Sequence, residues 1–281
     1  MLPAVVKLCC GISYPHLRSM TGLQRAAVAV IGQEISHLHT RRQVHHHLKA
    51  HAAQWNEPRF SPAPCSPSTD ETRLYQQQGR VAMETALCML QDRDGWKTEI
   101  TETNGDVICS KVLRGNKKVF KLEAVLDASV EQLYDVLFVR VEEMHRWNPS
   151  IQQIRVLQRL GPETVITHEV SAETAGNLIG QRDFLSVRHS CKNQTRVYLG
   201  GTAIQLDAFP PQSGFVRAED GPTCIVIEPA GPNRSKFTWL LNMDVKGWLP
   251  KSLVNQALPR AQLDFTRHLR GHLSAGGALR G

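Results

Sequence analysis

Two oppositely charged residues, Glu169 and Arg188, lie in segments that are otherwise rich in apolar and small residues. Such segments are usually buried, and a buried charge is costly unless an opposite charge accompanies it. Residues 175–180 are the turn-forming stretch between the two segments, so we expect a hairpin that places Glu169 directly opposite Arg188. The pair would then share one face with neighbours on both strands, namely Thr167, Ser171, Phe184 and Ser186.

This pair has three possible roles. A guanidinium and a carboxylate that neutralise each other can still offer one polar atom, or a bound water, to a hydroxyl group on an apolar ligand. Alternatively, the pair is a structural salt bridge that fixes strand register and touches no ligand. The third interpretation is acid–base catalysis by Glu169, but the sequence offers it no nucleophile, second carboxylate or set of metal ligands.

The elements around the pair are predicted mostly as strands. A helix is expected over 71–90, capped by Thr69 or Asp70, and a second from Ser129, which begins a near capping box, to about 138. Asn104-Gly105 between two apolar segments is a strong hairpin signal. A short helical piece should end at Met144. Strands are predicted at 96–103, 106–112, 119–126, 151–160, 163–172, 183–192, 195–203, 215–221, 223–229 and 235–245.

A long amphipathic helix is predicted after Pro250. Its apolar positions follow helical spacing: Val254, Leu258, Ala261, Phe265, Leu269 and Leu273. Pro259 falls inside this helix at a cost of about 3 kcal/mol, so we expect a kink near Asn255 or a helix in two pieces.

The order of these elements indicates an α+β fold of the helix-grip type. A curved antiparallel sheet would form a concave face, and the terminal helix would cover it and enclose a pocket. Phe265, Leu269 and Leu273 would form the apolar side of this cover, or serve as ordinary core contacts. The loop 208–214, which contains Pro210 and Pro211, and the terminal helix are the two candidates for opening the pocket.

Charge divides the chain into parts. Residues 1–60 hold seven Lys and Arg against two acids, whereas the remainder holds 26 basic and 24 acidic residues. An amphipathic stretch at 23–38 with no acid before Glu34 is typical of a mitochondrial transit peptide. We therefore expect a targeting leader at 1–60, a Pro- and Ser-rich linker at 61–69, a folded domain at 70–275 and a short tail at 276–281. The near-balanced domain does not favour nucleic acid as a partner.

Cysteine and histidine spacing gives no sign of a metal site or cofactor. The seven cysteines include no Cys-x-x-Cys pair, and the run His45-His46-His47 has no cysteine or carboxylate beside it. We expect reduced thiols, no bound metal and no cofactor.

Several segments closely resemble the START family of lipid-binding domains. They are Trp147-Asn148-Pro149, Ile166-Thr167-His168-Glu169, the stretch 175–184, Arg217-Ala218-Glu219-Asp220-Gly221-Pro222-Thr223-Cys224 and the stretch 246–252. The resemblance covers essentially all of 70–273, and the segments closely resemble those of the family's cholesterol-delivering founder. It implies cholesterol binding, transfer toward the inner mitochondrial membrane and support of steroid hormone synthesis.

The resemblance also implies roles for particular residues and partners. Glu169 and Arg188 correspond to a polar anchor for the ligand, Met144 and Asn148 match cavity-lining positions, and Arg182-Asp183 resembles a structural pair at a strand entrance. The implied partners are a sterol, the mitochondrial outer-membrane surface and the import machinery, with the protein acting as a monomer. Alternatives are a carrier of another sterol or a phospholipid, an enzyme on the same scaffold, or a membrane-tethered protein with a vestigial pocket.

One turn departs from the family member that the chain resembles. That member has a serine in a basophilic kinase site at the turn corresponding to 192–195. This chain has Lys192-Asn193-Gln194-Thr195 there, which matches such a site poorly. Regulation by phosphorylation at this turn is therefore not supported by the sequence.

Overall fold

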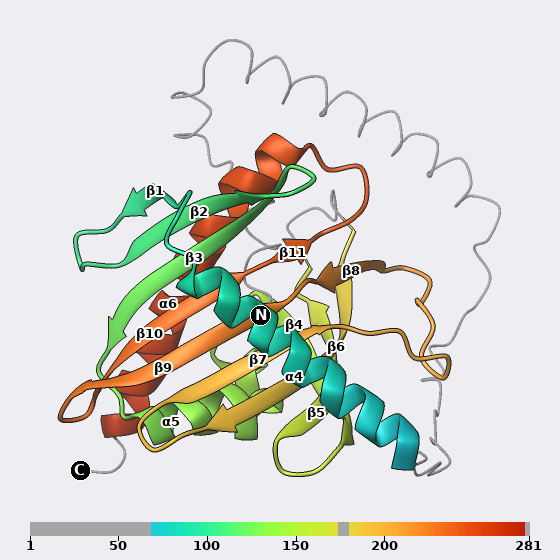
Figure 1. The fold of residues 1–281 in the computed structure, drawn as a ribbon, viewed down its shortest axis with the longest axis horizontal. Helices are drawn as coiled ribbons and strands as arrows, with labels where there is room; N and C mark the ends of the chain where they lie inside the picture. The colour runs from blue at the N-terminus through green and yellow to red at the C-terminus, as the bar shows by residue number, and fades with distance from the viewer. Residues whose placement is uncertain (1–68, 174–179, 279–281) are drawn as a thin grey trace, which may run out of the picture. The chain divides into compact units, whose positions relative to one another are not determined.

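Two long helices pack on opposite faces of one large sheet. The computed structural model describes residues 69–173 and 180–278, so the predicted leader and nearly all of the predicted linker lie outside the described residues. Helix α4 (Thr69–Gln91) precedes the sheet and helix α6 (Lys251–Ala278) follows it. Figure 1 shows α4 in front of the strands and α6 behind them.

Eleven strands make up the sheet within these residues, in the order β1-β2-β3-β10-β9-β7-β6-β5-β4, with β8 beside β6 and β11 beside β8. Paired strands run antiparallel except β6 and β8, which are parallel. The antiparallel curved sheet and the terminal helix confirm the predicted fold class. The bounds are β1 (Lys97–Thr101), β2 (Val107–Leu113), β3 (Lys117–Leu126), β4 (Ile151–Arg159), β5 (Thr164–Ser171), β6 (Arg182–Lys192), β7 (Val197–Ala203), β8 (Val216–Asp220), β9 (Thr223–Gly231), β10 (Arg234–Leu241) and β11 (Met243–Asp244).

The face of the sheet that α6 covers, called the inner face below, carries the main apolar core. Alternate residues of a strand point to opposite faces, so Leu122, Trp239 and Ile225, which pair across three neighbouring strands, share this face. They belong to one buried cluster with Phe265 and Leu269 of α6. Burial of this cluster is what fixes α6 against the sheet.

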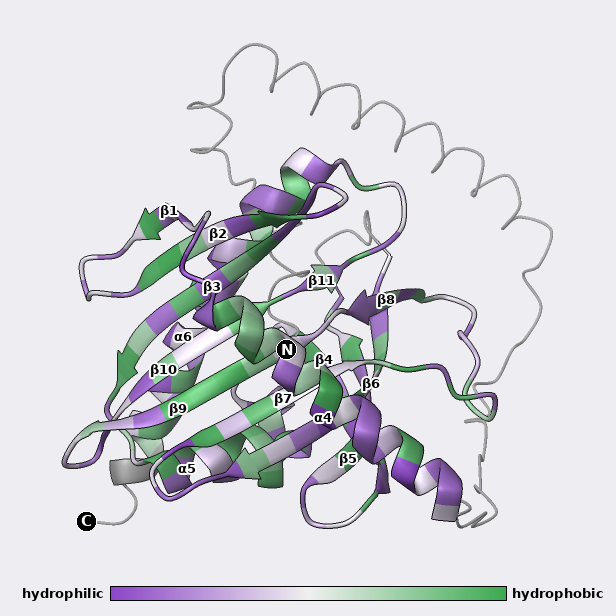
Figure 2. Cartoon of the chain, viewed as in Figure 1, coloured by the Kyte–Doolittle hydropathy of each residue, from purple (hydrophilic) through white to green (hydrophobic). Residues whose placement is uncertain are grey.

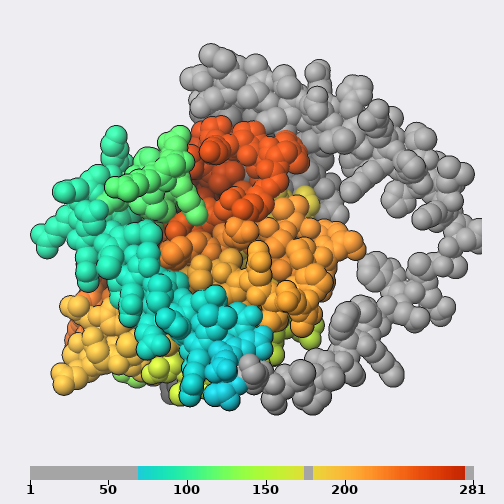
Figure 3. Space-filling model, turned by 45° about the vertical axis from the view of Figure 1, so that its right-hand side comes forward, coloured from blue at the N-terminus to red at the C-terminus, as the bar shows by residue number. Residues whose placement is uncertain are grey.

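The opposite, outer face is covered by α4. Met83 and Ala86 of this helix pack on the buried side chains of Cys224 and Leu240. Gly200 of β7 allows a close approach, since a Cβ there would lie 2.4 Å from the Cβ of Met83. Figure 2 shows hydrophobic residues along β9 and a mixed, largely polar surface on α4, and Figure 3 shows α4 lying directly on the strand residues.

Short helical segments connect β3 to β4. Ser129 caps α5 (Val130–Tyr134) through a capping box with Gln132, as the sequence predicts. The chain continues as a π-helical turn, η1 (Asp135–Val139), and a 3-10 turn, η2 (Val141–Arg146). The two turns bring Met144 and the following residues beneath the inner face.

Local signals in the sequence are largely confirmed. The Asn104-Gly105 turn joins β1 to β2, with a positive φ of 88° at Gly105 and the Asp106 amide donating to the side chain of Asn104. Helix α4 begins at Thr69, so this residue belongs to the helix and is not outside it as a cap.

No helix in the described part of the chain is long and apolar enough to cross a membrane.

One expectation about the C-terminal third is wrong, and one of the two alternatives for the terminal helix is excluded. The predicted strand 235–245 is broken at Asn242, where β10 ends and β11 turns to pair with β8. Helix α6 is one continuous helix with Pro259 inside it, so the cover is not in two pieces. Neighbouring contacts outweigh the backbone hydrogen bond that Pro259 cannot make, because Leu258 and Ala261 on either side are buried.

Candidate functional site

Glu169 and Arg188 form a buried ion pair on the inner face. The Nη2 atom of Arg188 lies 2.6 Å from Oε2 of Glu169, and its Nε donates to the hydroxyl of Thr167 at 3.1 Å. The side chains of Arg188 and Glu169 are only 9% and 4% exposed. Apolar residues of the main core, such as Val165 and Phe184, lie on the same strands and face. The pair, with the hydroxyls of Thr167 and Ser186 on the same face, therefore forms a buried polar group that borders the apolar core.

The register that brings the pair together differs from the predicted one. Glu169 lies opposite Phe184, and Arg188 lies opposite Val165, so the two charged residues are displaced by four positions along the ladder. A displacement by an even number keeps both side chains on one face. The long guanidinium side chain of Arg188 spans the offset. The predicted shared face is thus correct, whereas direct opposition is wrong.

Asp220 at the end of β8 adds a third charged group to this site. Its carboxylate is buried, and Oδ2 accepts a hydrogen bond of 3.3 Å from the hydroxyl of Ser186. Burial raises the pKa of Asp220 to about 6, and the negative charge of Glu169 adds to the effect while Arg188 opposes it. Asp220 was not among the residues that sequence reasoning selected, because its short strand gives no apolar alternation.

Met144 lies in η2 and Asn148 follows this turn, beside the main core. Met144 is fully buried in the core cluster, and its carbonyl accepts the backbone N–H of Asn148 at 2.9 Å. Asn148 is also buried, and its Oδ1 accepts from the amide of Ser150 at 3.1 Å. Among the described residues its Nδ2 has no hydrogen-bond partner. Asn148 thus presents a buried donor near the apolar core.

Helix α6 supplies the apolar cover. Phe265 and Leu269 are buried in the main core, and Leu273 is half-buried against it. The ring of Phe265 contacts two tryptophans, with centroids 5.1 Å from Trp239 in β10 and 5.4 Å from Trp147. Trp147 also stacks on His272 of α6 at 5.5 Å. The helix is therefore attached both to the sheet and to the residues that follow η2.

A second ion pair attaches the same helix to Asp106, the residue directly before β2. Arg270 donates two hydrogen bonds of 2.6 Å to the carboxylate of Asp106 and a third, of 3.0 Å, to the carbonyl of Val125. The two residues are 164 positions apart, so no local pattern in the sequence indicates this contact. Of the two, only Arg270 lies on the helix that covers the inner face.

The side chains of Arg182 and Asp183 make their contacts on opposite faces of β6. The guanidinium of Arg182 donates to the backbone carbonyls of Gly180, Val245 and Lys246, which joins the start of β6 to the segment before α6. Asp183 contacts His168 at 3.1 Å and Arg217 at 2.8 Å on the outer face. Burial alone would raise the pKa of Asp183, but hydrogen bonds from His168 and Arg217 outweigh it and hold the pKa below its ordinary value.

The loop with Pro210 and Pro211 joins β7 to β8 and both prolines are exposed. Phe209 in this loop packs on the ring of His168, with centroids 4.6 Å apart, and the carbonyl of Pro210 accepts from Arg217 at 3.4 Å. The cluster of His168, Asp183 and Arg217 therefore anchors the loop to the outer face. Sequence reasoning missed this anchor, because its members lie on three separate segments.

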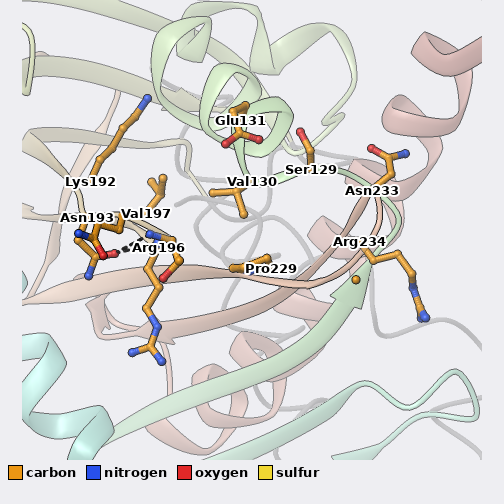
Figure 4. Close-up of a pocket in the computed structure, with 13 residues that line it drawn as sticks. Ser129, Val130, Glu131, Lys192, Asn193, Arg196, Val197, Pro229, Asn233 and Arg234 are labelled. Atoms are coloured by element: carbon orange, nitrogen blue, oxygen red, sulfur yellow. Dashed lines mark hydrogen bonds between the residues drawn. The ribbon is translucent and has the colours of Figure 1, made fainter.

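A separate surface pocket of about 370 Å³ lies where the start of α5 meets two turns of the sheet. Figure 4 shows Lys192 and Arg196 on one side of it and Ser129, Asn233 and Arg234 on the other. Arg196 is paired with Glu228 at 2.8 Å and Arg234 with Asp127 at 3.1 Å, so both arginines are neutralised. Within the described residues there is no group of three His, Cys, Asp or Glu side chains arranged to hold a metal ion.

Comparison with known proteins agrees with this arrangement. Residues 76–278 match the START domain family. The steroidogenic acute regulatory protein, mitochondrial, of Danio rerio is 45% identical over 288 residues, covering 99% of this chain and 98% of that protein. The protein of the same name from Bos taurus is also 45% identical, over 293 residues and 99% of each chain.

Solved structures agree on the fold. Human StAR-related lipid transfer protein 5 superposes with a TM-score of 0.67 at 19% identity, covering 73% of this chain and 99% of that one. Human STARD10 superposes with a TM-score of 0.57 at 19% identity, covering 72% and 79% of the two chains. The family match and the full-length relatives together confirm the resemblance seen in the sequence: the chain belongs to the START domain family.

Proposed function

We propose that this chain binds one molecule of cholesterol, or of a closely related sterol, between the inner face and α6, and transfers it into mitochondria without catalysing a reaction. The observation that carries the proposal is the buried pair of Glu169 and Arg188 on the face of the sheet that also carries the main apolar core. A sterol has one hydroxyl on a large apolar body, so a site with one polar centre and an apolar surround matches it.

The proposed contacts divide into a polar end and an apolar cover. Glu169 and Arg188 orient the hydroxyl, directly or through a bound water, and the free Nδ2 of Asn148 and the thioether of Met144 line the floor. Phe265, Leu269 and Leu273 contact the apolar body from α6. This division is supported by the chemistry of the residues, since the charged groups lie on the strands and the apolar ones on the helix.

The proposed location is the mitochondrion. Relatives named as mitochondrial steroidogenic acute regulatory proteins align with 99% of this chain, including its N-terminal segment. That segment has the acid-poor, Arg-bearing composition of a transit peptide. We infer that it directs the chain to the outer-membrane surface and the import machinery, and that cholesterol moves from the outer toward the inner membrane to supply steroid hormone synthesis. The proposed acting form is a monomer.

Entry and release of the ligand require part of the fold to move, and α6 is the first proposed gate. The helix is attached by the aromatic contacts of Phe265 and by the pair of Arg270 with Asp106, both of which can break without unfolding the sheet. Pro259 removes one backbone hydrogen bond of the helix and so lowers the cost of bending it there. The loop with Pro210 and Pro211 is a second proposed gate, and its outer-face anchor at Arg217 would have to release.

The experiment that tests the proposal is a titration of the purified full-length chain with a fluorescent sterol, compared with a double variant, Glu169→Gln with Arg188→Leu. The double variant removes both charges together, because removing Arg188 alone would leave Glu169 buried without its counter-ion and could unfold the protein. We expect saturable one-to-one binding by the native chain and a loss of at least about tenfold in affinity in the double variant.

Arg196→Leu is the matched control, because Arg196 also forms a salt bridge on the sheet but lies at the surface. It should bind as the native chain does. A folded native chain that takes up no sterol would overturn the proposal, and equal binding by the native chain and the double variant would overturn the role of the pair. Import of the full chain and of a chain without residues 1–60 into isolated mitochondria tests the location separately.

A further inference from the structure

We propose that Asp220 makes this site selective for a ligand that carries a hydroxyl group rather than a ketone, by accepting the hydroxyl's hydrogen bond on its Oδ1 atom. The inference rests on the proposed function, because it concerns the polar end of the same site. It adds a specificity-determining residue on a different strand from Glu169 and Arg188.

The strand pairing places Asp220 beside the ion pair. Strands β6 and β8 are parallel, with Phe184 opposite Ala218. Both of these residues belong to the main core on the inner face. Because every second residue faces the same way, Ser186 and Asp220 follow them onto that face. The hydrogen bond of 3.3 Å from the hydroxyl of Ser186 to Asp220 is consistent with this placement.

The carboxylate of Asp220 is only half satisfied. Ser186 donates to Oδ2, whereas Oδ1 is buried and has no hydrogen-bond partner among the described residues. Asp220 as a whole is 6% exposed. A buried acceptor without a donor is costly, and such groups in native proteins are usually satisfied by a ligand or an ordered water. Asp220 therefore has an open acceptor position on the inner face, next to the ion pair.

The ion pair of Glu169 and Arg188 does not supply a donor to Oδ1 of Asp220. The guanidinium of Arg188 lies 2.6 Å from Glu169 and matches its charge. No cation is in ion-pair distance of Asp220 in the described part of the chain. Among the described residues, the charged groups whose fields reach it are Glu169 on β5 and Arg188 on β6, while β7 and β11 present Thr202 and Met243, which do not titrate. Asp220 thus needs a hydrogen-bond donor more than Glu169 does, because Glu169 already binds Arg188.

Selectivity follows from what each ligand group can donate. An alcohol has an O–H that donates to a carboxylate oxygen, whereas a ketone has only lone pairs and would face that oxygen acceptor to acceptor. A site that hydrogen-bonds a ligand hydroxyl rejects the analogue without the donor, because its own polar group is then left unsatisfied. In the variant Asp220→Asn, the side chain presents an N–H as well as an oxygen, so it can form a hydrogen bond with either ligand.

The test compares two saturated sterols that differ only at carbon 3, 5α-cholestan-3β-ol and 5α-cholestan-3-one. Each competes with a fluorescent sterol for the full-length chain, and the ratio of their dissociation constants is measured for the native chain and for Asp220→Asn. We expect the native chain to favour the alcohol about tenfold or more, and the variant to favour it by less than about threefold. Glu219→Gln is the matched control, since it neutralises the adjacent carboxylate, which is paired with Lys246. It should keep the native ratio.

The outcomes separate this inference from the proposed function. If the native chain binds neither sterol, the proposed function fails and the inference with it. If both sterols bind and Asp220→Asn leaves the ratio unchanged, a water satisfies Oδ1 and only the inference is overturned.

A second measurement does not depend on the variant folding. A protonated carboxyl donates to a ketone, so the native ratio should fall as the pH is lowered from 8 to 5 because Asp220 gains a proton. A ratio that stays constant over this range, with the protein folded throughout, would also overturn the inference.

Discussion

Arg270 in α6 binds the carboxylate of Asp106 with both of its terminal nitrogens, each 2.6 Å from a different oxygen. The side chain of Asp106 is 3% exposed and that of Arg270 is 29% exposed, so the carboxylate depends on this partner for its buried charge. The contact joins the start of β2 to the last turns of the helix that covers the inner face. It is therefore a direct determinant of how firmly that helix is closed.

Arg270→Leu should loosen the C-terminal half of α6. The free energy of unfolding should fall by about 2–3 kcal/mol, because Asp106 is left buried without its charged donor. Backbone amides after Phe265 should exchange with deuterium faster than they do in the native chain, whereas those of β9 and β10 should be unchanged, as measured by mass spectrometry. Arg260→Leu, an exposed arginine on the same helix, is the control and should change neither quantity. Unaltered exchange in α6 of the first variant would contradict this prediction.

The sequence allowed the face of Glu169 and Arg188 to be predicted, but not their register. Strand alternation depends only on whether a residue number is odd or even, so any even displacement preserves the face. The connection between β5 and β6 is long, and its turn-forming residues do not fix a single centre of the hairpin. The actual offset of four positions is compatible with an ion pair only because the Arg188 side chain is long.

Other features of the structure could not be predicted from local sequence patterns. The alternation of apolar residues continues from β10 through Asn242 into β11, so the pattern gives no sign that the chain there leaves one partner strand for another. The contact of Arg270 with Asp106 and the cluster of His168, Asp183 and Arg217 each join segments that are far apart in the chain. Such contacts are set by the packing of the whole fold, whereas capping boxes and tight turns are set by a few neighbouring residues.

Gly200→Ala should weaken the attachment of α4. A Cβ at position 200 would lie 2.4 Å from the Cβ of Met83 and 2.8 Å from its Cα, so the helix backbone must shift. We expect a loss of about 1–3 kcal/mol in the free energy of unfolding, measured by urea denaturation. Met83→Ala in the same chain should not recover the loss, because alanine keeps the Cβ and Cα that clash and the change also removes buried apolar contacts. Gly180→Ala, where no atom lies within 4 Å of the added carbon, is the matched control.

His189 should make the outer face sensitive to acid. It is buried beside Gly79 of α4, and its Nδ1 lies 2.8 Å from the hydroxyl of Thr164. Burial lowers the pKa of His189 below 6.5, with a smaller contribution from Arg80. The unfolded chain therefore takes up the proton first, and stability that is complete above pH 6.5 is lost as the pH falls below it. His189→Gln should flatten the fall in melting temperature between pH 6.5 and 5, whereas the exposed His145→Gln should leave it unchanged.

Asp220→Asn should stabilise the protein at neutral pH, in the absence of ligand. The pKa of Asp220 is raised from 3.8 to about 6 by burial, so the folded state binds the proton more tightly than the unfolded state. Stability from this group is complete below pH 3.8 and is lost as the pH rises through about 6, to a total of about 3 kcal/mol.

The variant has no such loss, so its advantage in melting temperature should be greatest above pH 7 and should shrink as the pH is lowered toward 4. Glu219→Gln, the adjacent carboxyl, is paired with Lys246 at the surface and should give no such trend. An advantage that is independent of pH would mean that Asp220 is not a buried ionised group in the folded chain. Because the same carboxylate is proposed to select the ligand, a stabilised variant that also loses the preference for a hydroxyl would show that stability is sacrificed here for specificity.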